Sequence, residues 1–95
     1  MRTLLRITVP VEAGNIAIRD GRLQKLIASN LETLKPEAAY FYPERGQRSA
    51  IFVFDMKDSS EIAKIAEPFF LELNATVEYF PVMNPDDLTK GLQGA

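Results

Sequence analysis

The stretch Arg48-Ser-Ala-Ile-Phe-Val-Phe-Asp55 decides the fold. Its β-branched and aromatic residues are typical of a β-strand, in which successive side chains point to opposite faces. Ile51 and Val53 therefore lie on one face of this strand, and Phe52 and Phe54 lie on the other. Because both faces are apolar at its centre, the strand requires a cover on each side.

The run before this strand, residues 38–43, is also aromatic and apolar, and Glu44-Arg45-Gly46-Gln47 separates the two runs. We predict a β-hairpin here, because Gly46 can supply the positive φ that a tight turn needs. Loops of two or three residues both fit this spacing, and they differ by one residue of strand register. The pairing of individual side chains across the hairpin is therefore left open.

The spacing of apolar residues predicts the other elements, which are strands over residues 2–9 and 75–80 and helices over about 11–34, 59–73 and 85–91. Gly21 lies inside the first helix, where glycine costs about 1 kcal/mol. That helix is therefore either continuous or broken into two pieces at Gly21. Pro68 lies inside the second helix and predicts a kink or an early stop near Glu67.

The order strand, helix, strand, strand, helix, strand predicts one α+β domain of ferredoxin-like βαββαβ topology over residues 1–95. This topology has a four-stranded antiparallel sheet with helices on one face, and a short C-terminal helix follows it here. The first and fourth strands become neighbours in such a sheet. Arg6 and Glu78 are therefore expected to pair, partly buried, on the face away from the helices.

The composition excludes several kinds of chemistry. The chain has no Cys and no His, which removes disulfides, thiolate nucleophiles and imidazole metal ligands. A net charge of -2 argues against nucleic acid as a partner, and we expect no metal and no cofactor. The first apolar stretch is too short for a signal peptide, and none approaches the roughly 20 apolar residues of a membrane span. We therefore expect a cytoplasmic protein that does not bind membranes.

In its element order, the chain resembles the dimeric α+β barrel superfamily. Residues 34–41 (Leu-Lys-Pro-Glu-Ala-Ala-Tyr-Phe) and 66–69 (Ala-Glu-Pro-Phe) also look like a small bacterial family of unknown function. In the superfamily, two sheets pack face to face across a two-fold axis, so the resemblance implies a homodimer. The alternative is a monomer in which the terminal helix covers the open side of the sheet with Leu88 and Leu92.

Aromatic and polar side chains predict a cleft between the sheet and the helices that would suit a small planar, apolar ligand. The candidate ligand-binding residues are Arg6, Asn15, Arg19, Tyr40, Phe69 and Tyr79. Arg6 would orient an anionic group, and Asn15 or Arg19 would reach the cleft from a mobile first half of the first helix. The competing interpretation is that these residues form a register-fixing ion pair, core packing and a solvated helix face.

Glu78 and Tyr40 are the candidates for proton transfer, and burial would raise the pKa of Glu78. The superfamily includes cofactor-independent monooxygenases and isomerases as well as proteins with no established reaction, and fold analogy selects none of them. No nucleophile and base pair is recognisable in the sequence. Whether the chain is an enzyme is therefore left open between ligand binding, a monooxygenase or isomerase activity, and a non-catalytic interaction or regulatory module.

Overall fold

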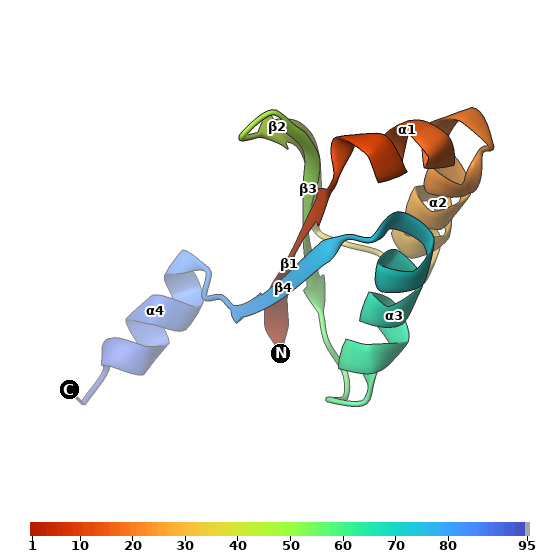
Figure 1. The fold of residues 1–95 in the computed structure, drawn as a ribbon. Helices are drawn as coiled ribbons and strands as arrows, with labels where there is room; N and C mark the ends of the chain where they lie inside the picture. Colours follow the sequence, from red (N-terminus) through yellow and green to blue (C-terminus); the bar gives the residue numbers. More distant parts are fainter. Residues whose placement is uncertain (95) are drawn as a thin grey trace.

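The computed structural model describes residues 1–94 and shows one open antiparallel sheet with three helices packed on one face (Figure 1). The strands are β1 (Arg2–Val9), β2 (Ala38–Glu44), β3 (Gln47–Asp55) and β4 (Thr76–Pro81), and the helices are α1 (Val11–Arg19), α2 (Arg22–Leu34), α3 (Glu61–Leu73) and α4 (Pro85–Leu92). The strand order is β2-β3-β1-β4. The predicted α+β fold class is confirmed, and the arrangement is close to the ferredoxin-like one.

The first predicted helix is broken at Gly21, so α1 and α2 are separate helices. Gly21 has a φ of +84°, a left-handed conformation that glycine adopts without steric cost. Asp20 supports the restart, because its side chain accepts a hydrogen bond from the backbone N–H of Arg22 at 3.0 Å. This bond, together with the guanidinium of Arg22, lowers the pKa of Asp20.

The β2–β3 hairpin has a two-residue loop, which settles the register that the sequence left open. Arg45 and Gly46 both have positive φ, 52° and 76°, as expected of a tight hairpin turn. Glu44 pairs with Gln47, and Tyr40 consequently lies opposite Ile51.

The core lies between the sheet and α1, α2 and α3. Phe52 and Phe54 of β3 point toward these helices and are fully buried, as are Leu5, Phe69 and Leu73. Burying a side chain of this size contributes about 1.5 to 3 kcal/mol. The two phenylalanines therefore fix which face of β3 receives the helices.

Helix α3 continues through Pro68 to Leu73, so the early stop, one of the two alternatives predicted near Glu67, is wrong. A proline inside a helix costs about 3 kcal/mol, because it removes one backbone hydrogen bond and crowds the preceding turn. Phe69 and Leu73 lie beyond the proline and are each 1% exposed. Their burial in the core offsets the cost and holds the last turn of the helix in place.

The face of the sheet away from α1, α2 and α3, called the open face here, is apolar at its centre. Leu4 pairs with Val53 on one side and with Phe80 on the other, and Tyr40 pairs with Ile51. Tyr40 and Phe80 are 64% and 39% exposed. No helix among residues 1–94 covers these side chains, so this cover of β3 is missing from the single chain.

Helix α4 projects away from the body of the domain (Figure 1). Its apolar residues Leu88 and Leu92 are 46% and 61% exposed, so the monomer in which they cover the open face is wrong. The radius of gyration is 14.9 Å, whereas a compact domain of this length has a value of about 12.4 Å. The elongated shape therefore results largely from α4, whose apolar side chains stay exposed instead of packing against the body of the domain.

Arg6 and Glu78 are direct cross-strand partners on the open face, as predicted. Two hydrogen bonds join them, from Nε to Oε1 at 2.9 Å and from Nη2 to Oε2 at 3.1 Å. The Arg6 guanidinium also lies 5.2 Å from the centre of the Phe80 ring. The pair aligns β1 with β4, although both side chains are one-third exposed or more.

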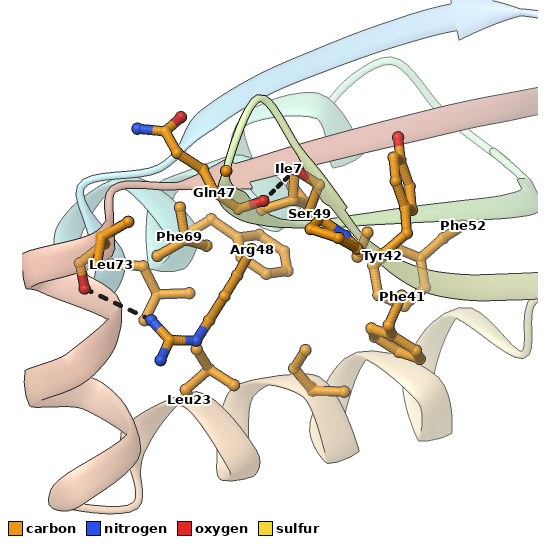
Figure 2. Close-up of a pocket in the computed structure, with 16 residues that line it drawn as sticks. Ile7, Leu23, Phe41, Tyr42, Gln47, Arg48, Ser49, Phe52, Phe69 and Leu73 are labelled. Atoms are coloured by element: carbon orange, nitrogen blue, oxygen red, sulfur yellow. Dashed lines mark hydrogen bonds between the residues drawn. The ribbon is translucent and has the colours of Figure 1, made fainter.

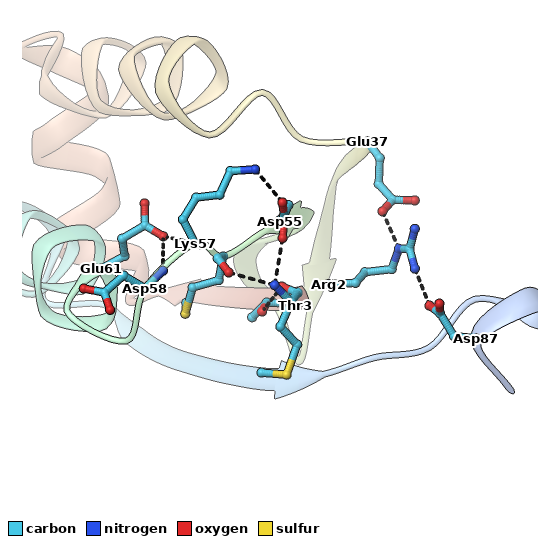
Figure 3. Close-up of polar contacts among 10 residues, drawn as sticks. Arg2, Thr3, Glu37, Asp55, Lys57, Asp58, Glu61 and Asp87 are labelled. Atoms are coloured by element: carbon cyan, nitrogen blue, oxygen red, sulfur yellow. Dashed lines mark hydrogen bonds and ion pairs between the residues drawn. The ribbon is translucent and has the colours of Figure 1, made fainter. Parts of the chain in front are cut away.

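A polar cluster joins the segments that meet at one end of the sheet (Figure 3). Asp55 accepts hydrogen bonds from the Met1 amine at 2.7 Å and from the Lys57 ammonium at 2.5 Å. These contacts lower the pKa of Asp55 to about 2, with Lys57 as the larger cause. Arg2 joins the remaining segments by pairing with Glu37 before β2 and with Asp87 in α4.

We predict that Asp55 makes the fold more sensitive to acid. Its pKa is about 2 in the folded chain against the usual 3.8, so the ionised carboxylate stabilises the fold above about pH 4. This stabilisation is lost as the pH falls toward about 2. In urea unfolding, Asp55→Asn should be less stable than the unsubstituted chain near neutral pH, and the gap should close as the pH approaches about 2. A stability difference that stays constant between neutral pH and about pH 2 would contradict this prediction. Asp86→Asn, which also removes one negative charge, is the control.

A double-mutant cycle tests the Arg6–Glu78 pair. Arg6→Met and Glu78→Gln should each lower the urea midpoint, because each leaves one charge without its partner. The urea midpoint of the double variant should fall by less than the sum of the two decreases seen in the single variants. Strictly additive losses would show that the two side chains do not interact in solution.

Candidate functional site

A cleft of about 570 Å³ opens between the β2–β3 hairpin and helices α1 and α2 (Figure 2). Leu23 and Ile27, four residues apart on α2, form one wall because that spacing places them on the same helix face. Phe52, Phe69 and Leu73 lie deeper in the cleft and belong to the core. This volume falls within the roughly 300 to 1,000 Å³ of small-molecule sites.

Aromatic rings give the cleft a surface suited to a flat ligand. Phe41 packs edge to face on Phe52, with ring centres 5.8 Å apart and an interplanar angle of 85°. Phe41 is 53% exposed, so much of its ring remains free for contact at the edge of the sheet. The exposed part of this ring has the geometry for an offset-stacked or edge contact with a planar ligand.

Arg48 carries the only formal charge among the sixteen described residues that line the cleft. Its side chain extends from β3 across the space toward α1, whereas Tyr42 and Gln47 point away from that space (Figure 2). Nη2 donates to Oδ1 of Asn15 at 3.0 Å, and Nη1 donates to the backbone oxygen of Val11 at 3.5 Å. Both partners are neutral, so the positive charge at the cleft is not compensated by them.

Gly14 makes room for this arginine. A Cβ atom at Gly14 would lie 2.7 Å from Nη1 of Arg48 and 3.2 Å from Cγ1 of Val9. Glycine in a helix interior costs about 1 kcal/mol relative to alanine, yet it stands in the middle of α1. The close approach of the guanidinium accounts for a residue that helix propensity alone disfavours.

A second hollow, of about 520 Å³, lies on the open face. It is lined by polar and charged residues, which are Arg6, Thr8, Glu44, Arg45, Gln47, Thr76 and Glu78. The charges of Arg6 and Glu78 neutralise each other there, and the hollow offers little apolar surface to a ligand. The two faces of the sheet therefore have different character.

The predicted ligand-binding residues do not gather at one place. Phe69 lines the cleft, and Asn15 reaches it through its hydrogen bond with Arg48. Arg6 and Tyr40 lie on the open face, on the opposite side of the sheet. Arg19 is exposed in the last turn of α1 and is not part of the lining.

Tyr79 is held by a structural contact between β4 and α3. Its hydroxyl donates to the backbone oxygen of Ile62 at 2.9 Å. Burial, with a smaller effect from the negative charge of Glu61, raises the pKa of Tyr79 to about 12. A phenol with this pKa stays protonated near neutral pH and acts as a hydrogen-bond donor rather than a base.

The rise in pKa expected for Glu78 is wrong. Its hydrogen bonds from Arg6 favour the ionised form, and they lower the pKa against the opposing effect of desolvation. A carboxylate with a lowered pKa is a poor proton donor near neutral pH. Glu78 and Tyr40, the two candidates for proton transfer, also occupy different strands of the open face, β4 and β2.

Sequence reasoning missed Arg48 and Gly14. Arg48 shares a face of β3 with Phe52 and Phe54, so it points to the helices because those rings do. The sequence did not show which apolar face of β3 the helices cover. Gly14 could have been found from the sequence, because an isolated glycine inside a helical pattern often indicates a close packing contact.

The described residues do not offer a metal site or a membrane-spanning helix. No group of three or more Asp or Glu side chains within residues 1–94 is arranged to hold a metal ion. In the same part of the chain, no helix has both the length and the apolar character needed to cross a bilayer. The chemistry that the cleft itself supports is apolar contact together with one cationic hydrogen-bond donor.

Comparison with known proteins does not assign the chain to a family. No protein-family model matches the sequence, and no curated protein is significantly similar to it.

Proposed function

We propose that this domain binds a small organic ligand with an apolar, aromatic body in the cleft between the β2–β3 hairpin and α1 and α2. The observation that carries the proposal is the cleft itself, whose volume of about 570 Å³ is large enough for a compact aromatic compound. Its walls are mainly apolar side chains, and a single charged group lies at its edge. Ligand sites commonly combine these two features, because the apolar walls supply affinity and the polar group sets orientation.

Binding is a better-supported function than catalysis. The lining contains no carboxylate, and the guanidinium of Arg48 offers hydrogen-bond donors but no acceptor. Tyr42 is the one lining residue with a phenol, and it points away from the space (Figure 2). A cofactor-independent monooxygenase or isomerase would need a proton-transfer group at the ligand, which this cleft does not supply from its own side chains.

Filling the cleft should abolish binding of an apolar probe. N-phenyl-1-naphthylamine is neutral and fluoresces more strongly in apolar surroundings, so it reports occupancy without needing a charged partner. We expect its fluorescence to rise with the unsubstituted protein and to lose most of that rise with Leu23→Trp, because an indole there occupies the space.

The matched control for this experiment is Ala28→Trp, since Ala28 is an exposed residue of α2 that is not part of the lining. It should retain the full fluorescence rise. Equal binding by both tryptophan variants would place the probe elsewhere on the protein and would contradict the proposed function.

A second function, homodimerisation through the open face, is favoured by the missing cover of β3. We infer that two copies bury Leu4, Tyr40, Ile51, Val53 and Phe80 against each other, with a sheet opposite a sheet. An isologous contact suits a surface that carries its own opposite charges, such as the Arg6–Glu78 pair. The resemblance to the dimeric α+β barrel superfamily implies the same arrangement.

The surface area of the single chain supports this second proposal. The accessible surface is 6413 Å², whereas a compact monomer of 10.7 kDa exposes about 5,500 Å². The excess of about 900 Å² is close to the roughly 800 Å² that each partner buries in a standard interface. Part of the excess belongs to α4, whose Leu88 and Leu92 would then contact the second copy.

The dimer proposal predicts twice the chain mass of 10.7 kDa in light scattering at micromolar concentration. Tyr40→Lys should shift the protein toward monomer, because it places a charge within the proposed interface, at a side chain that is 64% exposed in the single chain. Ile16→Lys is the control, since Ile16 is 57% exposed on α1 and should leave the mass unchanged. A monomeric unsubstituted protein at that concentration would refute the dimer.

A further inference from the structure

We infer that the ligand of the cleft is a monoanion, a carboxylate on a planar apolar body, and that Arg48 binds its charged group. This inference rests on the ligand-binding function proposed above and specifies the chemical class of the ligand. The observation behind it is that Arg48, at the edge of the cleft, is the one charged residue in a lining that is otherwise uncharged.

The guanidinium of Arg48 has unused capacity for hydrogen bonding. It carries five N–H donors, and the described contacts to Val11 and Asn15 use two of them. Within residues 1–94, no carboxylate forms an ion pair with Arg48, whereas Arg2, Arg6 and Arg22 are all paired in that way. A ligand carboxylate would supply the missing anion. Its two oxygens would accept hydrogen bonds from two of the remaining N–H groups at the same time.

The arginine is held at the cleft by specific neighbours. The oxygens of Asn15 and Val11 accept hydrogen bonds from its end, and Gly14 leaves the space in which Nη1 lies. Holding the guanidinium in place before binding reduces the entropy lost when a ligand is bound. The same neighbours are neutral, so they do not compete with an incoming anion for the positive charge.

The remainder of the cleft limits the ligand to one negative charge. Leu23, Ile27 and Phe41 supply apolar surface, and a second charged group placed against them would lose hydration without gaining a partner. A cationic ligand would be repelled by Arg48. A single carboxylate at the edge, with the rings of the ligand directed toward Phe52 and Phe69, satisfies both constraints.

The test compares 2-naphthoate with 2-naphthamide, which has nearly the same shape and no charge, by calorimetry at low ionic strength. We expect the unsubstituted protein to bind 2-naphthoate about tenfold more tightly, the usual gain for hydrogen bonds to a charged group. Added salt should reduce this ratio, because part of the attraction is a screened charge interaction.

Arg48→Met retains the apolar stem of the side chain and removes its charge, so it should bring the ratio of the two affinities to about one or below. Arg45→Met, which removes a positive charge from the adjacent turn outside the lining, should leave the ratio unchanged. Gly14→Ala should also reduce the ratio, because the added methyl group displaces the guanidinium. If Arg48 only tethers the hairpin to α1, Arg48→Met would lower stability and leave the ratio as it was.

An equal affinity of the unsubstituted protein for 2-naphthoate and 2-naphthamide would overturn the assignment of Arg48 and leave the proposed cleft function standing. If 2-naphthoate does not bind while N-phenyl-1-naphthylamine still binds, the assignment of Arg48 is likewise overturned and the cleft function stands. Failure of all three compounds to bind would overturn the ligand-binding function and this inference together. The salt dependence is measured on the unsubstituted protein, so the test does not depend on the folding of any variant.

Discussion

Strand β3 has to bury apolar side chains on both of its faces, and most of the structure follows from how each face is covered. Phe52 and Phe54 are covered by α1, α2 and α3, which creates the core. Ile51 and Val53 lie on the opposite face, where no helix among residues 1–94 packs over them. The sheet thus separates two kinds of surface, a covered face that contains a cleft and an open face on which no helix among residues 1–94 packs.

The cleft exists because the covered face is not closed completely at the hairpin. Near the turn, β3 presents Arg48 and the small residue Ala50 toward the helices, whereas Phe52 and Phe54 fill the space farther along. The helices contribute apolar walls there but no charge that neutralises the arginine. Core packing would fill a cleft of about 570 Å³ and would not leave Arg48 beside it without an anionic partner. Both features are expected of a site that binds a ligand.

The elements of the fold could be predicted because their signals are local. Gly21 marked the break between α1 and α2, and the Asn84–Asp87 capping box forms at the start of α4, the helix predicted over about residues 85–91. The site could not be predicted in the same way. Both faces of β3 are apolar, so the sequence did not show which face receives the helices, and the direction of Arg48 depends on that choice. Burial overrode local propensity at Pro68, where α3 continues because Phe69 is anchored in the core.

The most direct test of this account is a methyl NMR spectrum recorded with and without 2-naphthoate and at several protein concentrations. The account predicts that the ligand shifts the methyl signals of Ile7 and Ile27, which line the cleft. Dilution should shift those of Leu4 and Val53 on the open face instead. Ligand-induced shifts confined to the open face, or no shift on dilution of Leu4 and Val53, would contradict the division of roles between the two faces of the sheet.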